Sequence, residues 1–308
     1  MRAIRLHQVG GPEMLRHEDA PKPSPDGDQV LVQVSATAIT PTEFAWHPTF
    51  HTLEGGARPF PIILGHEFSG VVAAIGPDCI GVRIGDLVYG LNDWFSDGAQ
   101  AEYCLTVSSN LAPKPVSLDD TLSAAVPISA LTAWQALVDR GNLTEGQRVL
   151  IHGGAGGVGS FAVQLARYKR AYVIATASGD NANFVTALGA DEVIDYKATP
   201  FEAVVRDVDV VLDTVGGETR NRSWGVLRKG GRLVTIAADG ERFSDPRVRD
   251  AFFIVEPNRV QLLEISRLID AGVMRPVVGA VFPMEHFRQA YEQKPLRGKH
   301  VLHISGTS

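Results

Sequence analysis

The pattern of apolar and polar positions divides the chain near residue 120 into two parts. In the first part, Gln29–Ala38 places a valine or alanine at every second position, as a strand with a buried face does. Phe68–Ile75 and Asp86–Tyr89 are further apolar runs, bounded by glycine and proline. Residues 1–120 are therefore predicted to be rich in short strands joined by turns.

Beyond residue 120 the pattern becomes an alternation of helical spacing with short apolar runs. Helices are predicted at Ser123–Val138, Asn258–Ala271 and Glu285–Gln293. Strands are predicted at Arg148–Ile151, Tyr172–Ala175, Glu192–Ile194, Val208–Asp213, Gly231–Ile236, Ala251–Val255 and His300–Ile304. This alternation predicts an α/β fold with a parallel sheet that is covered by helices on both faces.

The segment Val149–Ala166 combines a buried strand, a glycine turn and the first turns of a helix. Gly154, Gly156 and Gly159 have the G-x-G-x-x-G spacing, in which the first glycine permits a tight turn. The second lets the backbone approach a pyrophosphate, and the third lets helix and strand pack closely. A helix that starts near Val158 directs its N–H groups at the phosphates. The loop therefore predicts a dinucleotide site, with a packing turn that binds nothing as the alternative.

Composition narrows the class of protein. With 308 residues, 44% of them hydrophobic and 21% charged, the chain is predicted to form about two soluble domains. A net charge of −6 argues against a nucleic-acid partner, and two cysteines exclude a disulfide framework or a four-thiolate zinc site. The N-terminus lacks the apolar stretch of a signal peptide, and no run suits a membrane span. We expect a cytoplasmic protein without membrane contact.

The strand after the glycine helix ends where the adenosine ribose is expected. NAD-specific sites place an acidic residue about 20 positions past the motif, and here that position falls on Ser178. A serine does not repel a 2′-phosphate and can donate to it, so the sequence favours NADP (NADPH) over NAD. Asp180 follows closely and no Arg or Lys follows directly, which makes Asn181 and Tyr196 candidates for neutral donors. The alternative for Tyr196 is an aromatic that caps a strand.

Several motifs in order give the chain a resemblance to the medium-chain dehydrogenase/reductase superfamily, and within it to the zinc-independent quinone oxidoreductases. These motifs are Met1–Asp19, Gly65–Val72, Gly85–Gly90, Ile128–Trp134, Leu188–Tyr196, Asp213–Gly217 and Gly298–Leu302. The resemblance implies a GroES-like β domain formed by residues 1–120 and 256–308. Residues 121–255 between them are implied to form a Rossmann NADP-binding domain. It also implies a homodimer that pairs near Ala251–Val255.

Zinc alcohol dehydrogenases of this superfamily are expected to hold their catalytic metal through two cysteines and a histidine. The matching positions here are Thr40, His66 and Ser129. Hydroxyls are poor zinc ligands beside thiolate or imidazole, so one good ligand remains and no metal is expected. His66 is then expected to make a structural or cofactor-side hydrogen bond.

Without a metal, the expected chemistry is hydride transfer to an electron-poor acceptor, a small-molecule quinone or α,β-unsaturated carbonyl. A donor to the acceptor oxygen stabilises the charge that develops there, and Thr40, Trp46 and Tyr89 are the candidates. The alternative for Thr40 is a turn beside Pro41. His47 and His51 lie in a loop that either covers the acceptor or is solvated.

The resemblance also implies the set of residues that contact the cofactor. The set is Thr40, Thr132, Gly154, Ala155, Gly156, Gly157, Val158, Ser178, Asn181, Tyr196, Val215, Ala237, Phe253, Val255 and Lys299. Two rival functions stay open at this point. One is a zinc-dependent alcohol dehydrogenase, and the other is an NADPH-binding redox sensor with little turnover.

Overall fold

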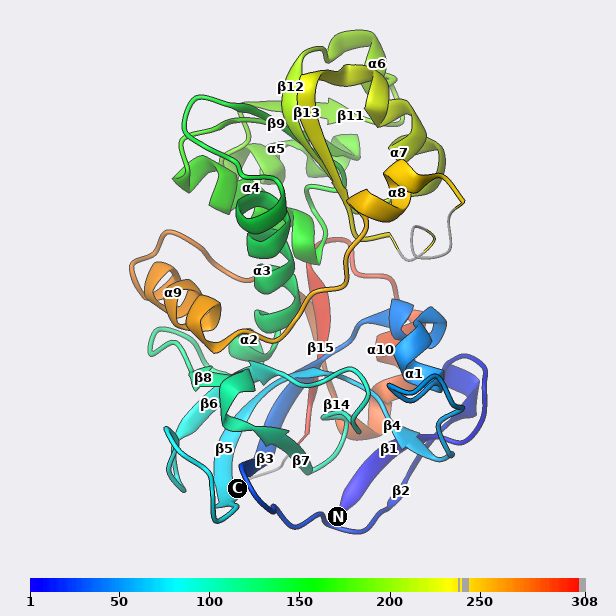
Figure 1. The fold of residues 1–308 in the computed structure, drawn as a ribbon, viewed down its shortest axis with the longest axis vertical. Coiled ribbons are helices and arrows are strands. Elements are labelled where there is room, and N and C mark those ends of the chain that lie inside the picture. The colour runs from blue at the N-terminus through cyan, green and yellow to red at the C-terminus, as the bar shows by residue number, and fades with distance from the viewer. Residues whose placement is uncertain (238, 240–243, 305–308) are drawn as a thin grey trace.

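Strands from both ends of the chain form one seven-stranded sheet in the computed structural model (Figure 1), which describes residues 1–237, 239 and 244–304. The last four residues of the expected 256–308 segment lie outside these ranges. The strand order is β14-β15-β3-β5-β6-β8, and β7 also pairs with β3. The strands are β3 (Gln29–Ala38), β5 (Glu67–Ile75), β6 (Leu87–Leu91), β7 (Tyr103–Val107), β8 (Leu111–Pro113), β14 (Val278–Pro283) and β15 (Lys299–His303).

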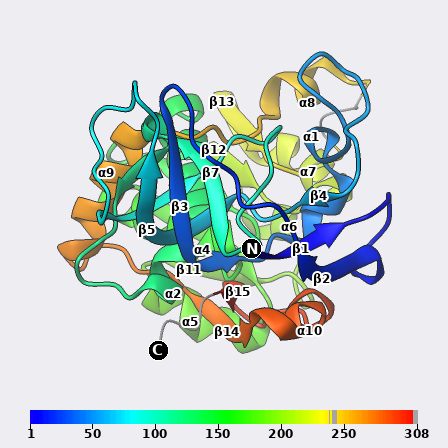
Figure 2. The ribbon, with the colours of Figure 1, turned by 90° about the horizontal axis from the view of Figure 1, so that it is seen from below.

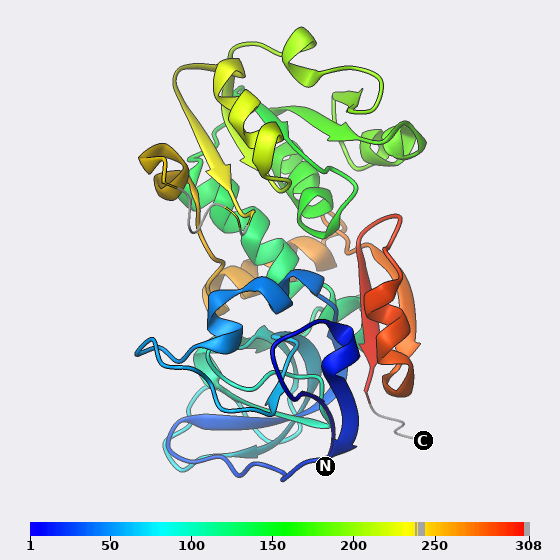
Figure 3. The same ribbon diagram turned by 90° about the vertical axis from the view of Figure 1, so that its right-hand side faces the viewer.

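The last strands complete a sheet that the first part of the chain begins. β15 is antiparallel to β3, with Val301 opposite Ala38, and parallel to β14. Figure 2 shows β3 with β5 and β7 beside it, and Figure 3 shows β14, β15 and α10 (Phe287–Glu292) together at one side. A separate three-stranded sheet is made by β2 (Leu15–Asp19), β1 (Arg2–Leu6) and β4 (Ile62–Ile63).

The middle of the chain folds into a five-stranded parallel sheet with the order β11-β10-β9-β12-β13. Counted from β9, this is the 3-2-1-4-5 order of a dinucleotide-binding sheet, whose ligand crevice lies where the order reverses, between β9 and β12. The strands are β9 (Arg148–Ile151), β10 (Tyr172–Ala177), β11 (Glu192–Asp195), β12 (Val208–Asp213) and β13 (Leu227–Thr235). The α/β fold expected from the alternating pattern is confirmed.

Helices connect and flank the two sheets. Those of the parallel sheet are α4 (Gly157–Tyr168), α5 (Ala182–Ala187), α6 (Phe201–Val204), α7 (Gly217–Ser223) and α8 (Pro246–Ala251). The others, besides α10, are α1 (His47–Phe50), α2 (Asp120–Ala124), α3 (Pro127–Trp134) and α9 (Arg259–Asp270). α3 lies between the sheets in Figure 1 and is buried along most of its length. In the described ranges, no helix is long and apolar enough to cross a bilayer.

The single helix predicted at Ser123–Val138 is wrong, because the segment forms three pieces. α2 ends at Ala124, α3 begins at Pro127, and a π-helical turn follows at Gln135–Arg140. Proline has no N–H to donate to a preceding turn, so it ends one helix and suits the first position of the next.

The strand predicted at Ala251–Val255 is also wrong. α8 ends at Ala251, and within the described residues the segment is joined to the sheet by an isolated bridge between Thr235 and Phe252 and by no regular strand pairing. Side chains bind the backbone instead: Trp94 Nε1 donates to the carbonyl of Val255 at 2.7 Å, and the Gln135 amide bonds both backbone groups of Glu256. The homodimer that the resemblance implies near this segment stays a prediction.

A buried histidine in the parallel sheet gives the stability a defined pH dependence. His152 follows β9, and its two ring nitrogens contact the hydroxyls of Thr176 and Ser223. Burial lowers the pKa of His152 to about 4, because the charged ring loses its hydration. The unfolded chain therefore binds a proton near pH 6.5 that the folded chain does not take until about pH 4.

We expect this difference to remove stability as the pH falls from about 6.5 to about 4, by roughly 3 kcal/mol in total. Above that window the contribution is fully present. The measurement is the free energy of unfolding against pH for wild type and His152→Gln. The variant should lack this part of the acid slope, and parallel curves for the two proteins would contradict the assignment.

Candidate functional site

A cleft of about 450 Å³ lies where the two sheets meet, at the predicted crevice of the parallel sheet. We call it the central cleft. Residues that line it come from the segments after β3, β6, β12 and β13, from α3, from the start of α4 and from the start of β15. They include Ile39, Thr40, Pro41, Thr42, Trp46, Pro48, Trp94, Ile128, Ser129, Thr132, Gly157, Val158, Thr214, Val215, Ile236, Ala237, Asp239, Phe252, Phe253, Ile254, Val255, Gly298 and Lys299.

The glycine loop lies at one edge of this cleft. The glycine that makes the tight turn is not the one that the sequence predicted. Gly153, and not Gly154, supplies the left-handed turn, with a φ of 73°. A Cβ on Gly154 would lie 3.1 Å from side-chain atoms of Ala175 and Val185, so Gly154 serves packing. On Gly159 a Cβ would lie 2.1 Å from the carbonyl oxygen of Gly153, which confirms its predicted packing role. A Cβ on Gly156 would meet only that same oxygen, at 3.4 Å.

The start of β15 is attached to the glycine loop. The N–H of Gly298 donates to the carbonyl of Ala155 at 2.9 Å, and Gly156 and Gly298 form a parallel bridge. Gly157 and Val158 open α4 and line the cleft, whereas Gly154, Ala155 and Gly156 form the turn beside it. The N–H groups at the start of α4 are therefore presented at the cleft, as anion binding requires.

The adenosine ribose of the cofactor is expected beyond the ends of the parallel strands β10 and β11. Ala177 pairs with Asp195, so Ser178 and Tyr196 are neighbours at the end of the sheet. Asn181 is not an available donor, which corrects the sequence prediction: it is buried, and its NH₂ group donates to Ser178 Oγ at 3.1 Å and to the carbonyl of Leu296 at 3.3 Å. Because Ser178 Oγ accepts in that bond, its own O–H is left to donate elsewhere. Tyr196 is exposed and keeps both of its predicted alternatives.

Arg297, which the resemblance places in a late segment that approaches the cofactor, also lies at this end of the cleft. Its Nε donates to Asn181 Oδ1 at 2.7 Å, and its guanidinium lies over the ring of Phe184, 4.5 Å from the centroid. The two contacts hold a cation next to the Ser178–Asn181 pair. Arg297 and Asn181 are 116 positions apart, so the local sequence gives no indication of their contact.

On the other side of the cleft, Thr40 and Lys299 meet across the seven-stranded sheet. Lys299 Nζ donates to Thr40 Oγ1 at 2.9 Å and also bonds the Glu67 carboxylate. Glu67 is fully buried and accepts from the N–H of Ile128 at 2.8 Å. Burial raises the pKa of Glu67, and the Lys299 ammonium acts against that rise. Among the described residues, the Thr40 hydroxyl takes no part in capping the turn at Pro41–Ala45, so the turn alternative for Thr40 is wrong.

The two other candidate donors have different outcomes. Trp46 lines the cleft and packs edge-on against Trp94, with ring centroids 4.9 Å apart. Tyr89 does not reach the cleft. It is fully buried and its hydroxyl donates to the carbonyl of Leu262 at 2.7 Å, which corrects its prediction as a donor to the acceptor. Burial also raises the pKa of Tyr89, so it holds its proton tightly.

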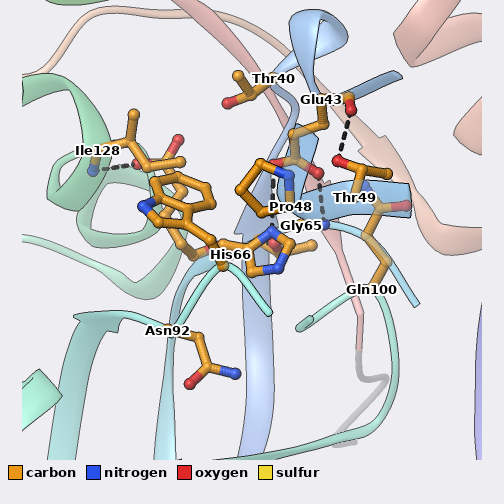
Figure 4. A network of polar contacts seen from close by, with 12 residues as sticks. Thr40, Glu43, Pro48, Thr49, Gly65, His66, Asn92, Gln100 and Ile128 are labelled. Carbon is orange, nitrogen blue, oxygen red and sulfur yellow. Dashed lines mark hydrogen bonds and ion pairs between the residues drawn. The ribbon is translucent and has the colours of Figure 1, made fainter. Parts of the chain in front are cut away.

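His66 lies behind the cleft wall in a buried polar cluster (Figure 4). Its Nε2 lies 3.3 Å from the carbonyl oxygen of Ser96, and its Nδ1 lies 3.6 Å from a Glu43 oxygen. Glu43 also accepts from the N–H of Gly65 at 2.9 Å. These contacts agree with the structural role expected for His66. In the part of the chain that the structure describes, no three His, Cys, Asp or Glu side chains gather into a possible metal site.

The remaining predicted cofactor residues are brought together. Thr132, Val215, Ala237, Phe253 and Val255 all line the central cleft. His47 and His51 are not part of its lining as described; their rings stack on each other 4.0 Å apart. Asp239 lines the cleft and forms an ion pair with the buried Arg220 at 2.8 Å, a pairing without any sequence signal.

Known proteins resemble this chain along nearly its whole length. Residues 26–120 match the family described as "Alcohol dehydrogenase GroES-like domain", and residues 188–302 match "Zinc-binding dehydrogenase". A protein of Arthroderma benhamiae named "Probable zinc-binding oxidoreductase, mitochondrial" is 31% identical, with 94% of this chain and 92% of that protein covered. The human "NAD(P)H oxidoreductase RTN4IP1, mitochondrial" is also 31% identical, with 90% and 82% covered.

Among solved structures, the quinone oxidoreductase from Coxiella burnetii superposes with a TM-score of 0.88. It is 30% identical, and the superposition covers 99% of each chain.

Proposed function

Because the chain belongs to the medium-chain dehydrogenase/reductase superfamily, in its quinone oxidoreductase-like group, we propose that it is an NADPH-dependent, zinc-independent reductase. Its acceptor is a small quinone or α,β-unsaturated carbonyl. The observation that carries the proposal is the Thr40–Lys299–Glu67 group in an apolar cleft beside a glycine loop.

The chain's own residues suit a nicotinamide dinucleotide. The start of α4 at Gly157 would hold the pyrophosphate, and Val215, Ala237 and Phe253 would line the path towards the acceptor. Ser178 and Arg297 would hold a 2′-phosphate, one by its hydroxyl and the other by charge. When bound, NADPH supplies the hydride.

The same residues do not suit a catalytic zinc ion. Thr40 Oγ1 already accepts from the Lys299 ammonium, and a second cation beside that ammonium would be repelled. Ser129 offers a neutral hydroxyl, which is a weak ligand compared with thiolate. His66 is turned to Ser96 and Glu43. The word "zinc-binding" in the names of relatives therefore does not extend to the donor set of this chain.

The shape of the cleft supports reduction of a flat, conjugated acceptor. Trp46 and Trp94 form one wall, and Ile128 and Phe253 add apolar surface from other segments. Such walls exclude water and orient the acceptor, while the Thr40 hydroxyl offers a donor for its oxygen. The names of two relatives place those proteins in mitochondria, so a cytoplasmic location for this chain stays a prediction.

The test is turnover of NADPH by the purified chain with a panel of quinones, enones, enals and, in the reverse direction, alcohols with NADP⁺. We expect consumption with quinones or enones, no alcohol oxidation, and no effect of added zinc or of a chelator. Alcohol oxidation that depends on zinc would favour an alcohol dehydrogenase instead. Tight NADPH binding without turnover of any acceptor would favour a redox sensor.

A further inference from the structure

The bond between Lys299 and Thr40 fixes the direction of the Thr40 hydroxyl. An ammonium group can only donate, so Thr40 Oγ1 accepts at 2.9 Å from Lys299 Nζ. The proton of the Thr40 hydroxyl must then point away from Lys299. Thr40 lines the central cleft, and within the described residues its side chain makes no cap to the following turn. The hydroxyl is thus a donor poised at the cleft.

Lys299 is a buried cation at the same place. It is 9% exposed, and among the described residues that line the cleft it is the only lysine or arginine. Its stem packs beside the glycine loop, since a Cβ on Gly157 would lie 2.8 Å from Lys299 Cγ and 3.0 Å from Ser129 Oγ. Ser129 Oγ is itself buried with no hydrogen-bond partner among the described residues.

Glu67 holds the ammonium in this position. Its carboxylate bonds Lys299 and is fixed by the N–H of Ile128, so β5, α3 and β15 each contribute one member of the arrangement. A buried carboxylate without its cation is costly. The pair therefore favours return of a proton to Lys299 whenever that proton has left.

We propose that Lys299 and Thr40 form a proton relay that delivers the proton taken up by the acceptor oxygen. The inference rests on the proposed function. In an enone, the hydride forms a C–H bond at the β-carbon, the C=C electron pair forms a double bond between the α-carbon and the carbonyl carbon, and the C=O π pair moves to the oxygen. The Thr40 O–H bond then breaks to give the enol O–H, and a Lys299 N–H bond breaks to restore the threonine hydroxyl.

Solvent replaces the proton that Lys299 has given up. Lys299 is left as a neutral amine beside the Glu67 carboxylate and regains a proton from water once the product has gone. The released enol converts to the ketone in water. A quinone oxygen takes its proton by the same route. Lys299 is in this assignment a catalytic residue on the acceptor side, and not only a contact for the cofactor as the sequence implied.

The experiment compares wild type with Lys299→Met, Thr40→Val and Thr40→Ser, using the most reactive quinone and enone of the panel. We expect Lys299→Met and Thr40→Val to lower kcat about 100-fold, the range for loss of a general acid, when NADPH is saturating so that any change in cofactor affinity does not enter. Thr40→Ser keeps the hydroxyl and should retain most of kcat. Lys229→Met, at an exposed lysine of β13, is the matched control.

A second variant separates the relay from folding, because Lys299→Met leaves Glu67 buried and unpaired. The double variant Glu67→Gln/Lys299→Met removes both charges and keeps an acceptor for the N–H of Ile128. It should melt near wild type and still lack kcat. The solvent deuterium isotope effect on kcat should change in Lys299→Met but not in Lys229→Met.

The outcomes distinguish the two proposals. An active wild type with Lys299→Met or the folded double variant within threefold of its kcat overturns the relay and leaves the proposed function intact. A wild type that consumes NADPH with no quinone or enone overturns the proposed function and the relay with it.

Discussion

Gly156→Ala is expected to weaken NADPH binding about 100-fold and to change the free energy of unfolding by less than about 1 kcal/mol. The added methyl group has room inside the protein, because its nearest neighbour is the Gly153 carbonyl oxygen at 3.4 Å. It projects instead where the backbone must approach a pyrophosphate. Titration of cofactor fluorescence and chemical unfolding measure the two quantities separately.

Gly159→Ala is the matched comparison in the same loop. Its methyl group would lie 2.1 Å from the Gly153 carbonyl oxygen, where no side chain can move aside. Alanine gains about 1 kcal/mol over glycine inside a helix, but the overlap should cost about 3 kcal/mol or more and therefore decide the sign. We expect a lower free energy of unfolding together with loss of binding. If Gly156→Ala binds NADPH as wild type does, the loop does not contact a pyrophosphate.

Arg297→Met is expected to weaken NADPH binding about 10- to 100-fold, the contribution of a hydrogen bond to a charged group, and to leave NADH binding almost unchanged. Wild type should bind NADPH at least about tenfold tighter than NADH. The Asp195 carboxylate acts against this preference, because it lies 2.8 Å from where a Cβ on Gly179 would stand and repels the phosphate.

The measurement is the dissociation constant of each cofactor for both proteins. Arg16→Met, at an exposed arginine of β2, controls for the change in net charge. Arg297 also packs on Phe184, so melting temperatures must show that the variant is folded. Equal weakening of NADPH and NADH would assign Arg297 to packing, and a wild type with no preference would remove the NADP assignment.

Local patterns predicted the parallel sheet well, because most of its strands are short apolar runs that lie between helical segments. β9 and β12 have the predicted bounds, at Arg148–Ile151 and Val208–Asp213. Prediction failed where side chains from far away decide the outcome. Trp94 and Gln135 bond the backbone near Val255 and so replace a strand partner that periodicity suggested.

β14 was missed for a related reason. Val278–Pro283 contains glycine and ends in proline, and it becomes a strand because β15 lies beside it.

In the site, too, contacts between residues that are distant in sequence could not be predicted. Motif spacing predicted the glycine loop, Ser178 and Thr40 as candidates, because each belongs to a motif of neighbouring residues. It could not show that Lys299 reaches Thr40 or that Arg297 reaches Asn181, because each pair is joined only by the folded sheets. Tyr89 was predicted to donate to the acceptor, but it is fully buried away from the cleft. Nothing in the neighbouring sequence indicates that burial.

The attachment of β15 to β3 also constrains how the protein folds. Thr40 and Lys299 are 259 positions apart, and the chain between them contains the whole parallel sheet. Bringing the ends of a flexible loop together costs more entropy as the loop lengthens. Once the parallel sheet has formed, however, the chain that enters it near Gln135 and leaves it near Glu256 is held together by the bonds between these two residues, and the effective loop is shorter. The parallel sheet thus lowers the entropy cost of pairing β15 with β3, and the acceptor side of the cleft depends on that pairing.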